Sequence, residues 1–97
     1  MHALRVRIRR VLSTEAPVTV ECMMTDYAGQ MHYFHNRLSA FTAESDPMIP
    51  GDGLIRCTVR AEHPLFAEVS TELPDFIEST AGLTEFRVAC SDLTDQA

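Results

Sequence analysis

The stretch "VTVECMMTDYAGQMHYFHNR", residues 18 to 37, decides the fold class of this chain. In the strand that begins this stretch, every second residue is apolar and is expected to face the core: Val18, Val20, Cys22 and Met24. A period of two is typical of a β-strand with one face on the core. After this strand, Asp26 can accept hydrogen bonds from the backbone that follows it, and Gly29 can adopt a positive φ. The sequence therefore predicts a β-hairpin over residues 18 to 41.

Three further segments alternate in the same way. Residues 4 to 9 place apolar side chains at even positions and arginines at odd ones, and residues 55 to 61 and 85 to 90 show the same period. The stretch "ESDPMIPGDGL" at residues 44 to 54 crowds prolines and glycines together, which predicts a loop. Residues 64 to 73 are ambiguous, because Pro64 can open a short helix while "FAEVST" alternates like a strand. The strand is the favoured interpretation.

Together these segments predict an all-β fold, either a small antiparallel β-barrel or a curved sheet of five to six strands. An α+β fold with one short helix near residues 64 to 73 is the alternative. The length of 97 residues suits a single domain over residues 1 to 97. Within it, the polar residues 91 to 97 are predicted to be a frayed tail.

The cysteines and the N-terminal residues indicate the compartment. The cysteines are odd in number and form no Cys-x-x-Cys pair, so neither a disulfide framework nor a zinc ribbon is expected. The stretch "MHALRVRIRRVLS" lacks the continuous apolar segment of an export signal, and no run approaches the ~20 apolar residues of a membrane span. We therefore expect a cytoplasmic protein with no membrane contact, in which three reduced thiols point inward from their strands: Cys22, Cys57 and Cys90.

The histidines and serines form no catalytic or metal-binding motif. His32 and His35 are three residues apart, and on a strand this spacing sends the two rings to opposite faces. The serines lie in no Gly-x-Ser-x-Gly elbow, and the absence of lysine excludes a phosphate-binding P-loop. The sequence therefore predicts that the protein is not an enzyme and binds no cofactor or metal.

Tyr33 and Phe34 are the aromatic pair of the hairpin, and they point to opposite faces. One ring is predicted to enter the core, and the other to anchor a protein partner or to stack on a nucleic-acid base. Arginines on two other strands would share one wet face if those strands are neighbours: Arg5, Arg7, Arg9, Arg56 and Arg60. That face suits a nucleic-acid-binding barrel, which is the alternative function. A net charge of −6 opposes it, and arginines paired with acids across a sheet are the simpler interpretation.

The last third of the chain is acidic. Residues 61 to 97 hold one arginine against eight acids, a net charge of −7. A solvated surface is the simplest interpretation, and recognition of a basic protein is the functional one. The leading hypothesis is a small acidic interaction module, of the inhibitor or immunity type, whose acidic contacts would be Glu68, Glu72, Asp75 and Glu78. A homodimer formed by pairing of strand edges is also expected.

Three stretches resemble a group of small bacterial proteins whose function is not known: "VECMMTDYAGQMHYF", "PGDGLIRCTVRAE" and "ESTAGLTEFRVAC". The shared pattern is Glu-Cys, Asp-x-x-Gly, His-x-Phe, Pro-x-x-Gly-x-Ile-x-Cys and Glu-Ser-Thr-x-Gly, over residues 18 to 90. Where that group has a longer and more basic connection, this chain has the short "EHPLFAEVS". The resemblance implies a cytoplasmic bacterial domain and assigns no role to the matched residues, which are Glu21, Cys22, His32, Phe34, Cys57 and Glu78.

Overall fold

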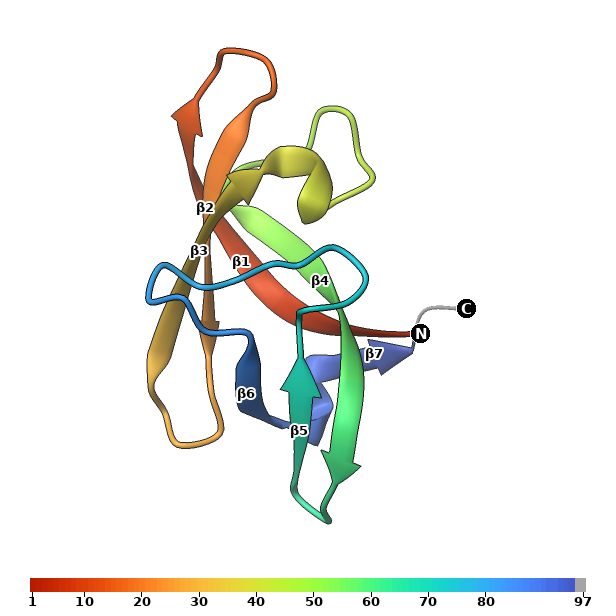
Figure 1. The fold of residues 1–97 in the computed structure, drawn as a ribbon. Helices are drawn as coiled ribbons and strands as arrows, with labels where there is room; N and C mark the ends of the chain where they lie inside the picture. Colours follow the sequence, from red (N-terminus) through yellow and green to blue (C-terminus); the bar gives the residue numbers. More distant parts are fainter. Residues whose placement is uncertain (96–97) are drawn as a thin grey trace.

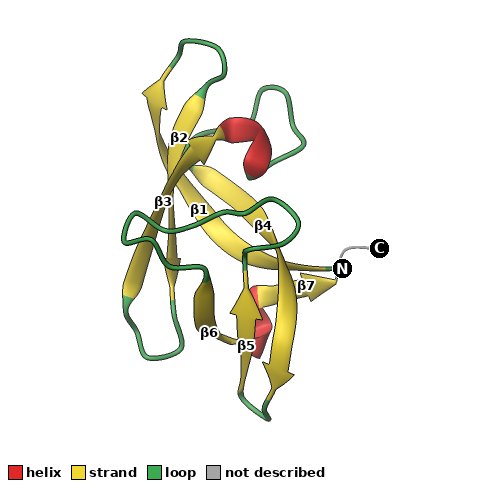
Figure 2. Ribbon diagram, in the orientation of Figure 1, coloured by secondary structure: helices red, strands yellow, loops and turns green. Residues whose placement is uncertain are grey.

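The computed structural model of this chain describes residues 1 to 95. In that range the backbone forms seven β-strands and two 3₁₀ helices (Figure 2). The strands are β1 (His2–Ser13), β2 (Thr19–Thr25), β3 (Met31–Arg37), β4 (Gly51–Glu62), β5 (Phe66–Ser70), β6 (Glu85–Ala89) and β7 (Leu93–Asp95). The helices are η1 (Leu38–Ala40) and η2 (Cys90–Asp92).

The strands pair antiparallel in a sheet that curls into a half-barrel (Figure 1). The strand order is β3-β2-β1-β4-β5-β6, and β7 pairs with the start of β1. Register shifts interrupt the pairing of β1 with β2 and of β4 with β5, and such irregularities let a sheet bend. The prediction of an all-β fold built on a curved antiparallel sheet is confirmed.

Strand parity decides which side chains reach the core on the inner side of the half-barrel. Between Leu4 and Arg9 of β1, the apolar residues are buried and the arginines are exposed, as the alternation predicts, whereas Val11 and Leu12 near the end of the strand are exposed. Phe34 is the aromatic ring of the hairpin that enters the core, where it meets Phe86 with ring centroids 5.7 Å apart. The core cluster consists of Leu4, Val6, Ile8, Val20, Cys22, Met24, Phe34, Phe41, Ile55, Cys57, Ala67, Val69, Ile77, Phe86 and Val88.

The turn between β2 and β3 has the predicted chemistry. Asp26 Oδ1 accepts hydrogen bonds from the N–H groups of Ala28 and Gln30, at 3.0 and 2.9 Å, and Gly29 adopts a φ of 88°. The other end of the hairpin differs from the prediction. Strand pairing stops at Arg37, because the chain then turns through η1 and brings Phe41 into the core.

Contacts between this turn and the β5–β6 pair bring the two ends of the sheet together. The N–H of Tyr27 donates to the carbonyl of Arg87 at 2.8 Å, and the Tyr27 ring stacks on Phe66 with centroids 5.0 Å apart. His63 also stacks on Phe66, at 4.4 Å. The two Tyr27 contacts hold the half-barrel in its curled form, because they join the β2–β3 turn to β5 and β6, with which β2 and β3 form no ladder.

The start of β4 lies inside the stretch that the sequence assigns to a loop. Gly51 and Gly53 pair with Ile8 and Val6 of β1, so the loop prediction holds only as far as Pro50. A Cβ at Gly53 would lie 2.9 Å from Cγ1 of Ile8. Gly53 is therefore needed because a side chain there would collide with Ile8. In the sequence the same glycine looks like a turn residue, which is why the predicted loop extended too far.

The structure of the C-terminal half shows which interpretation of residues 64 to 73 is correct, and it shows that the predictions for Cys90 and for the tail are wrong. Residues 66 to 70 form β5, so the strand interpretation of residues 64 to 73 is correct and the short helix does not form. Cys90 is exposed in η2, because β6 ends at Ala89 and the alternation stops there. The predicted frayed tail instead forms η2 and β7, and β7 pairs with His2 to Leu4 of β1. The last two positions of that predicted tail lie outside the described residues.

No helix within residues 1 to 95 has the length and apolar character needed to cross a bilayer.

Candidate functional site

The loop between β5 and β6, residues 71 to 84, crosses the front of the half-barrel and is the most distinctive surface of the molecule (Figure 1). It consists of two small lobes, residues 72–76 and 79–83, with Ile77 buried in the core close to the point where they meet. The second lobe is closed by Ser79, whose N–H donates to the carbonyl of Leu83 and whose Oγ accepts from the N–H of Leu83. The N–H of Thr80 donates to the carbonyl of Tyr33 on β3 at 2.8 Å. The loop is therefore anchored at both the core and a neighbouring strand.

The 72–76 lobe is closed at its base by Thr71 and Ile77. The N–H of Ile77 donates to the carbonyl of Thr71 at 2.9 Å, and the Thr71 hydroxyl donates back to the carbonyl of Ile77. At the tip, the N–H of Phe76 donates to the carbonyl of Glu72, and Phe76 has a φ of 51°. Phe76 is the one non-glycine residue with a positive φ in residues 1 to 95. The lobe therefore holds a bulky residue in a conformation that L-amino acids avoid.

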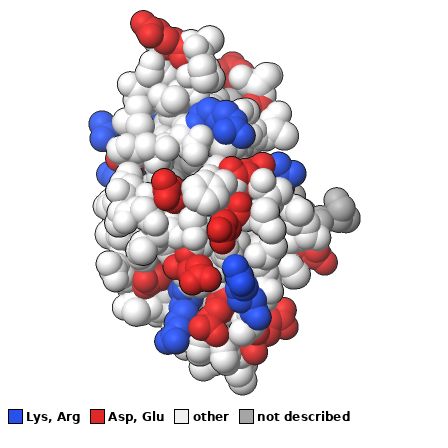
Figure 3. Space-filling model, viewed as in Figure 1, with Lys and Arg blue, Asp and Glu red and all other residues white. Residues whose placement is uncertain are grey.

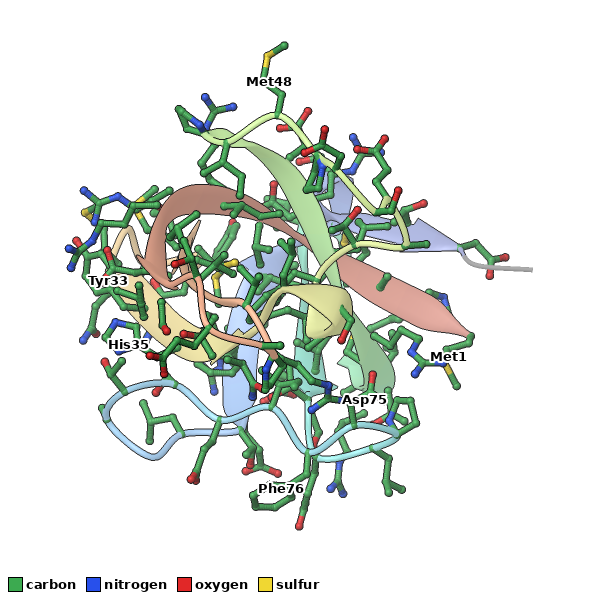
Figure 4. All side chains as sticks on the ribbon, turned by 90° about the horizontal axis from the view of Figure 1, so that it is seen from above. Met1, Tyr33, His35, Met48, Asp75 and Phe76 are labelled. Atoms are coloured by element: carbon green, nitrogen blue, oxygen red, sulfur yellow. The ribbon has the colours of Figure 1, made fainter. Side chains whose placement is uncertain are left out.

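An ion pair fixes the side of the same lobe. Arg56 of β4 donates from Nε to Oδ2 of Asp75 at 3.0 Å and from Nη2 to Oδ1 at 2.7 Å. This two-pronged geometry suits the planar guanidinium and restrains rotation of both side chains. Figure 4 shows the result, with Asp75 turned in toward the strands and Phe76 pointing away from the molecule.

The tip of the lobe combines apolar surface with carboxylates. Leu73 is 65% exposed and Phe76 is 56% exposed. A hollow of about 450 Å³ lies beside them, and it is lined by Thr58, Arg60, Ser70, Glu72, Leu73, Pro74 and Phe76. Acidic side chains gather across the middle of the face that the loop crosses (Figure 3). The lobe thus presents two apolar side chains within an acidic surrounding.

The acids expected to contact a partner are mostly paired inside the molecule. Asp75 is held by Arg56, Glu68 lies 3.6 Å from Arg87, and Glu72 lies 3.9 Å from Arg60. Glu78 is exposed and forms no ion pair within the described part of the chain. Asp75 therefore has a structural role, whereas the contacts of Glu68 and Glu72 with their arginines are longer and leave both carboxylates partly exposed.

The predicted row of arginines is divided by the same pairing. β1 and β4 are neighbours, and their register places Arg5, Arg7 and Arg56 on the outer face. Arg56 is held by the loop acid, and Arg7 lies 3.7 Å from the exposed Asp52. Arg5 forms no ion pair within residues 1 to 95 and lines a separate hollow with Phe41 and its neighbours. The structure therefore does not bring these arginines into one unpaired row.

The expected pairing of strand arginines with acids across the sheet occurs at Glu21, but sequence reasoning did not foresee that two arginines and His35 meet there. We call this group the Glu21 cluster: Glu21, Arg9, Arg10 and His35. The Glu21 side chain lies on the outer face of β2, yet it is only 9% exposed because two guanidiniums and the His35 ring contact it. Hydrogen bonds from Arg10 and His35 lower the pKa of Glu21 from 4.5 to about 2, although burial opposes the shift. The bulge between Ile8 and Arg10 lets two consecutive arginines reach the same carboxylate. The alternation of apolar residues and arginines breaks at Arg9 and Arg10, which is the signal in the sequence that could have indicated the bulge.

The two histidines of the hairpin lie on opposite faces, as predicted. His32 is buried, and its Nε2 donates to Asp26 Oδ2 at 2.8 Å. Burial raises the pKa of Asp26, but the bonds from His32 and from the N–H of Gln30 outweigh it, so the pKa lies below its ordinary value. This pair therefore locks the turn of the hairpin. No group of three potential metal-ligating side chains occurs in residues 1 to 95.

Comparisons with protein-family models, with curated proteins and with solved structures found no match to this chain. The resemblance described above therefore stays a prediction, and the argument for function rests on the geometry of the molecule.

Proposed function

We propose that this chain is a protein-binding module that docks a basic protein partner on the 72–76 lobe, in the manner of an inhibitor or immunity protein. Phe76 and Leu73 would be the apolar anchors, and Glu72 and Glu78 would form the charged rim. The core of such an interface is apolar and its rim is polar. The lobe has this arrangement on a small scale.

The observation that carries the proposal is the conformation of Phe76. A bulky residue at positive φ costs about 1–3 kcal/mol, and such strain is found where a site requires it. Here the strain is combined with the exposure of more than half of the residue's surface, so the folded chain gains little burial from Phe76. Contacts made by Thr71, Ile77 and Asp75 fix the lobe before any partner arrives. A rigid aromatic anchor loses little entropy on binding, which favours affinity.

The negative charge of the surface around the lobe favours a basic partner. Residues 61 to 97 have a net charge of −7, and only part of this charge is neutralised by Arg56, Arg60 and Arg87. A complementary basic surface would associate faster, and an acidic one would be repelled. The hollow beside the lobe offers the carboxylate of Glu72 to a cationic side chain of the partner.

Differential capture tests the proposal. The immobilised chain is exposed at low salt to nuclease-treated extract of the cell that encodes it, in parallel with the Phe76→Ala and Leu65→Ala variants. Leu65 is the matched control, because it is an exposed apolar residue of β4–β5 at 70% exposure. We expect a basic protein on the wild type and on Leu65→Ala that is lost from Phe76→Ala.

With that partner purified, Phe76→Ala should weaken binding by at least about 30-fold, the loss typical of a central anchor. The double variant Glu72→Gln/Glu78→Gln should slow association and reduce its salt dependence. Retention of the same proteins by Phe76→Ala, or capture of acidic partners only, would contradict the proposal.

We also propose that the module acts in the bacterial cytoplasm. The support is the resemblance and the three cysteines, all of which are free thiols. Homodimerisation through strand edges stays a prediction. Part of the β3 edge is occupied by Thr80, and part of the β6 edge by Tyr27, so such pairing would have to use the remaining edge groups.

A further inference from the structure

The outer face of β1, β2 and β3 carries a second surface that lies apart from the 72–76 lobe. Residues directly opposite each other on paired strands share a face. The register therefore aligns Arg7 with Tyr33 across Met23, and Arg10 with His35 across Glu21. We call the following set the basic sheet face: Arg7, Arg9, Arg10, Tyr33, His35 and Arg37. Seen from above, Tyr33 and His35 lie on a different side of the molecule from Phe76 (Figure 4).

This face has an excess of positive charge at its centre. Glu21 is a single carboxylate among two guanidiniums and an imidazole, at contacts of 3.2, 3.1 and 2.8 Å. Arg37 forms no ion pair within the described residues, and Arg7 has only the long contact to Asp52. The buried carboxylate orients the guanidiniums without using all their N–H donors. The remaining donors are available to an anionic ligand.

An aromatic ring lies within the charged cluster. The guanidinium carbon of Arg9 lies 5.5 Å from the centroid of the Tyr33 ring. An open hollow of about 430 Å³ borders the pair, and it is lined by Arg9, Arg10, Glu21, Tyr33, His35 and Thr80. Flat aromatic and guanidinium groups beside basic side chains are the features that hold stacked bases and phosphates on single strands.

The net charge of −6 does not oppose an anionic ligand at this place. All six members of the basic sheet face lie in residues 1 to 60, which have a net charge of +1, and the residue of the acidic segment 61 to 97 that lines the hollow is the uncharged Thr80. Charges more than about 10 Å apart are largely screened at 0.1 M salt. Local charge therefore governs a ligand on the basic sheet face, and the total charge does not.

We propose that the basic sheet face binds single-stranded nucleic acid, with Arg10 and Arg37 on phosphates and Tyr33 stacked on a base. The ligand is extended, because the face is open and runs across three strands rather than enclosing a small molecule. It is single-stranded, because only unpaired bases expose the faces that stack on an aromatic ring. This surface is independent of the 72–76 lobe, so either proposal can fail alone.

Fluorescence anisotropy of a dye-labelled oligodeoxythymidine of about 15 nucleotides tests the proposal, because single-strand sites cover about 4–16 nucleotides. Contacts to three or four phosphates predict that log K falls with log salt concentration with a slope of about −2 to −3. Tyr33→Ala should weaken binding about tenfold, while Tyr33→Phe retains it. Arg37→Gln should weaken binding and reduce the slope by about 0.7. The matched control Arg60→Gln, which removes a guanidinium from the acidic side, should leave binding unchanged.

Several outcomes would overturn the proposal. One is the absence of any anisotropy change at about 20 mM salt, where phosphate contacts are strongest. Another is competition by a heparin fragment of equal charge as effective as that by unlabelled oligonucleotide, which would reduce the surface to a site for any polyanion. Tighter binding of duplex than of single strand would also overturn it. Arg37 is exposed and unpaired in the described chain, so Arg37→Gln keeps the test decisive if Tyr33→Ala does not fold.

Discussion

Arg56 and Asp75 join the middle of β4 to the tip of the β5–β6 loop, with both carboxylate oxygens bonded at 3.0 and 2.7 Å. We expect Arg56→Gln to loosen the 72–76 lobe and leave the sheet intact, because Ile77 still anchors the base of the loop. A partly exposed pair of this kind contributes ~1 kcal/mol. Hydrogen exchange at residues 72 to 76 should therefore accelerate about fivefold. Arg60→Gln is the control, since its carboxylate contacts are 3.9 Å long.

Equal exchange rates in the Arg56→Gln and Arg60→Gln proteins would show that the ion pair does not restrain the lobe.

Replacement of Phe76 should stabilise the fold while it removes the proposed anchor. Asparagine tolerates the left-handed conformation better than a bulky ring, and the exposed Phe76 side chain buries little apolar surface. We expect Phe76→Asn to raise the free energy of unfolding by ~0.5–1 kcal/mol in urea denaturation. The control Leu65→Asn also removes an exposed apolar residue, but it relieves no positive φ and should change stability little. A loss of stability in Phe76→Asn would show that the ring packs in the folded state.

Glu21 should make the fold sensitive to acid. Its pKa is lowered from 4.5 to about 2 in the folded chain, by hydrogen bonds from Arg10 and then His35. Because the folded-state pKa is the lower one, the stabilisation is complete above about pH 4.5 and disappears as the pH falls toward 2. Glu21→Gln should cost ~2 kcal/mol at neutral pH, the contribution of hydrogen bonds to a charged group. Its difference from the wild type should shrink steadily below about pH 4.5 in denaturation series.

A difference between the Glu21→Gln and wild-type proteins that stays constant from neutral pH to about pH 2 would show that the cluster contributes through packing rather than through charge.

The thiols should differ in their reactivity. Burial, together with the charge of Glu21, raises the pKa of Cys22 to about 12, and burial raises the pKa of Cys57 to about 11. Both thiols are therefore protonated at neutral pH and covered by the core, whereas Cys90 is exposed. Brief treatment of the native protein with iodoacetamide should label Cys90 alone, as peptide mass spectrometry would show. Labelling of all three cysteines should require denaturant, and rapid native labelling of Cys22 would contradict the described core.

The aromatic stack at Phe66 should be needed to keep the half-barrel curled. The centroid of the Phe66 ring lies 5.0 Å from that of Tyr27, 4.4 Å from that of His63 and 5.8 Å from the guanidinium carbon of Arg87. Phe66→Ala removes all three contacts and should lower the free energy of unfolding by ~2 kcal/mol. Leu65→Ala, next to it and exposed, should change stability by less than ~0.5 kcal/mol. Faster hydrogen exchange of the Tyr27 amide in Phe66→Ala would show that the lost stability comes from the β2–β3 turn. An unchanged free energy of unfolding would contradict this role of Phe66.

The sequence by itself determined the fold class, because the alternation of apolar and polar residues is a local property of each strand. It was sufficient to place Leu4, Ile8 and Ile55 in the core and to separate His32 from His35. The chemistry of the hairpin turn at Asp26 was equally local. Alternation identified an inward and an outward ring in the pair Tyr33 and Phe34, and tertiary packing selected Phe34 for the core.

Only the tertiary structure decided where the candidate sites lie, because each depends on residues far apart in the chain. The φ of Phe76, the pairing of Arg56 with Asp75 and the role of Gly53 beside Ile8 arise from the meeting of distant segments. The break in alternation at Arg9 and Arg10 marks a bulge, but only the pairing of β1 with β2 shows that it brings two arginines to Glu21. The sequence fixes the total charge of −6 and its concentration in residues 61 to 97, whereas folding decides which arginines of β1 and β3 share the basic sheet face.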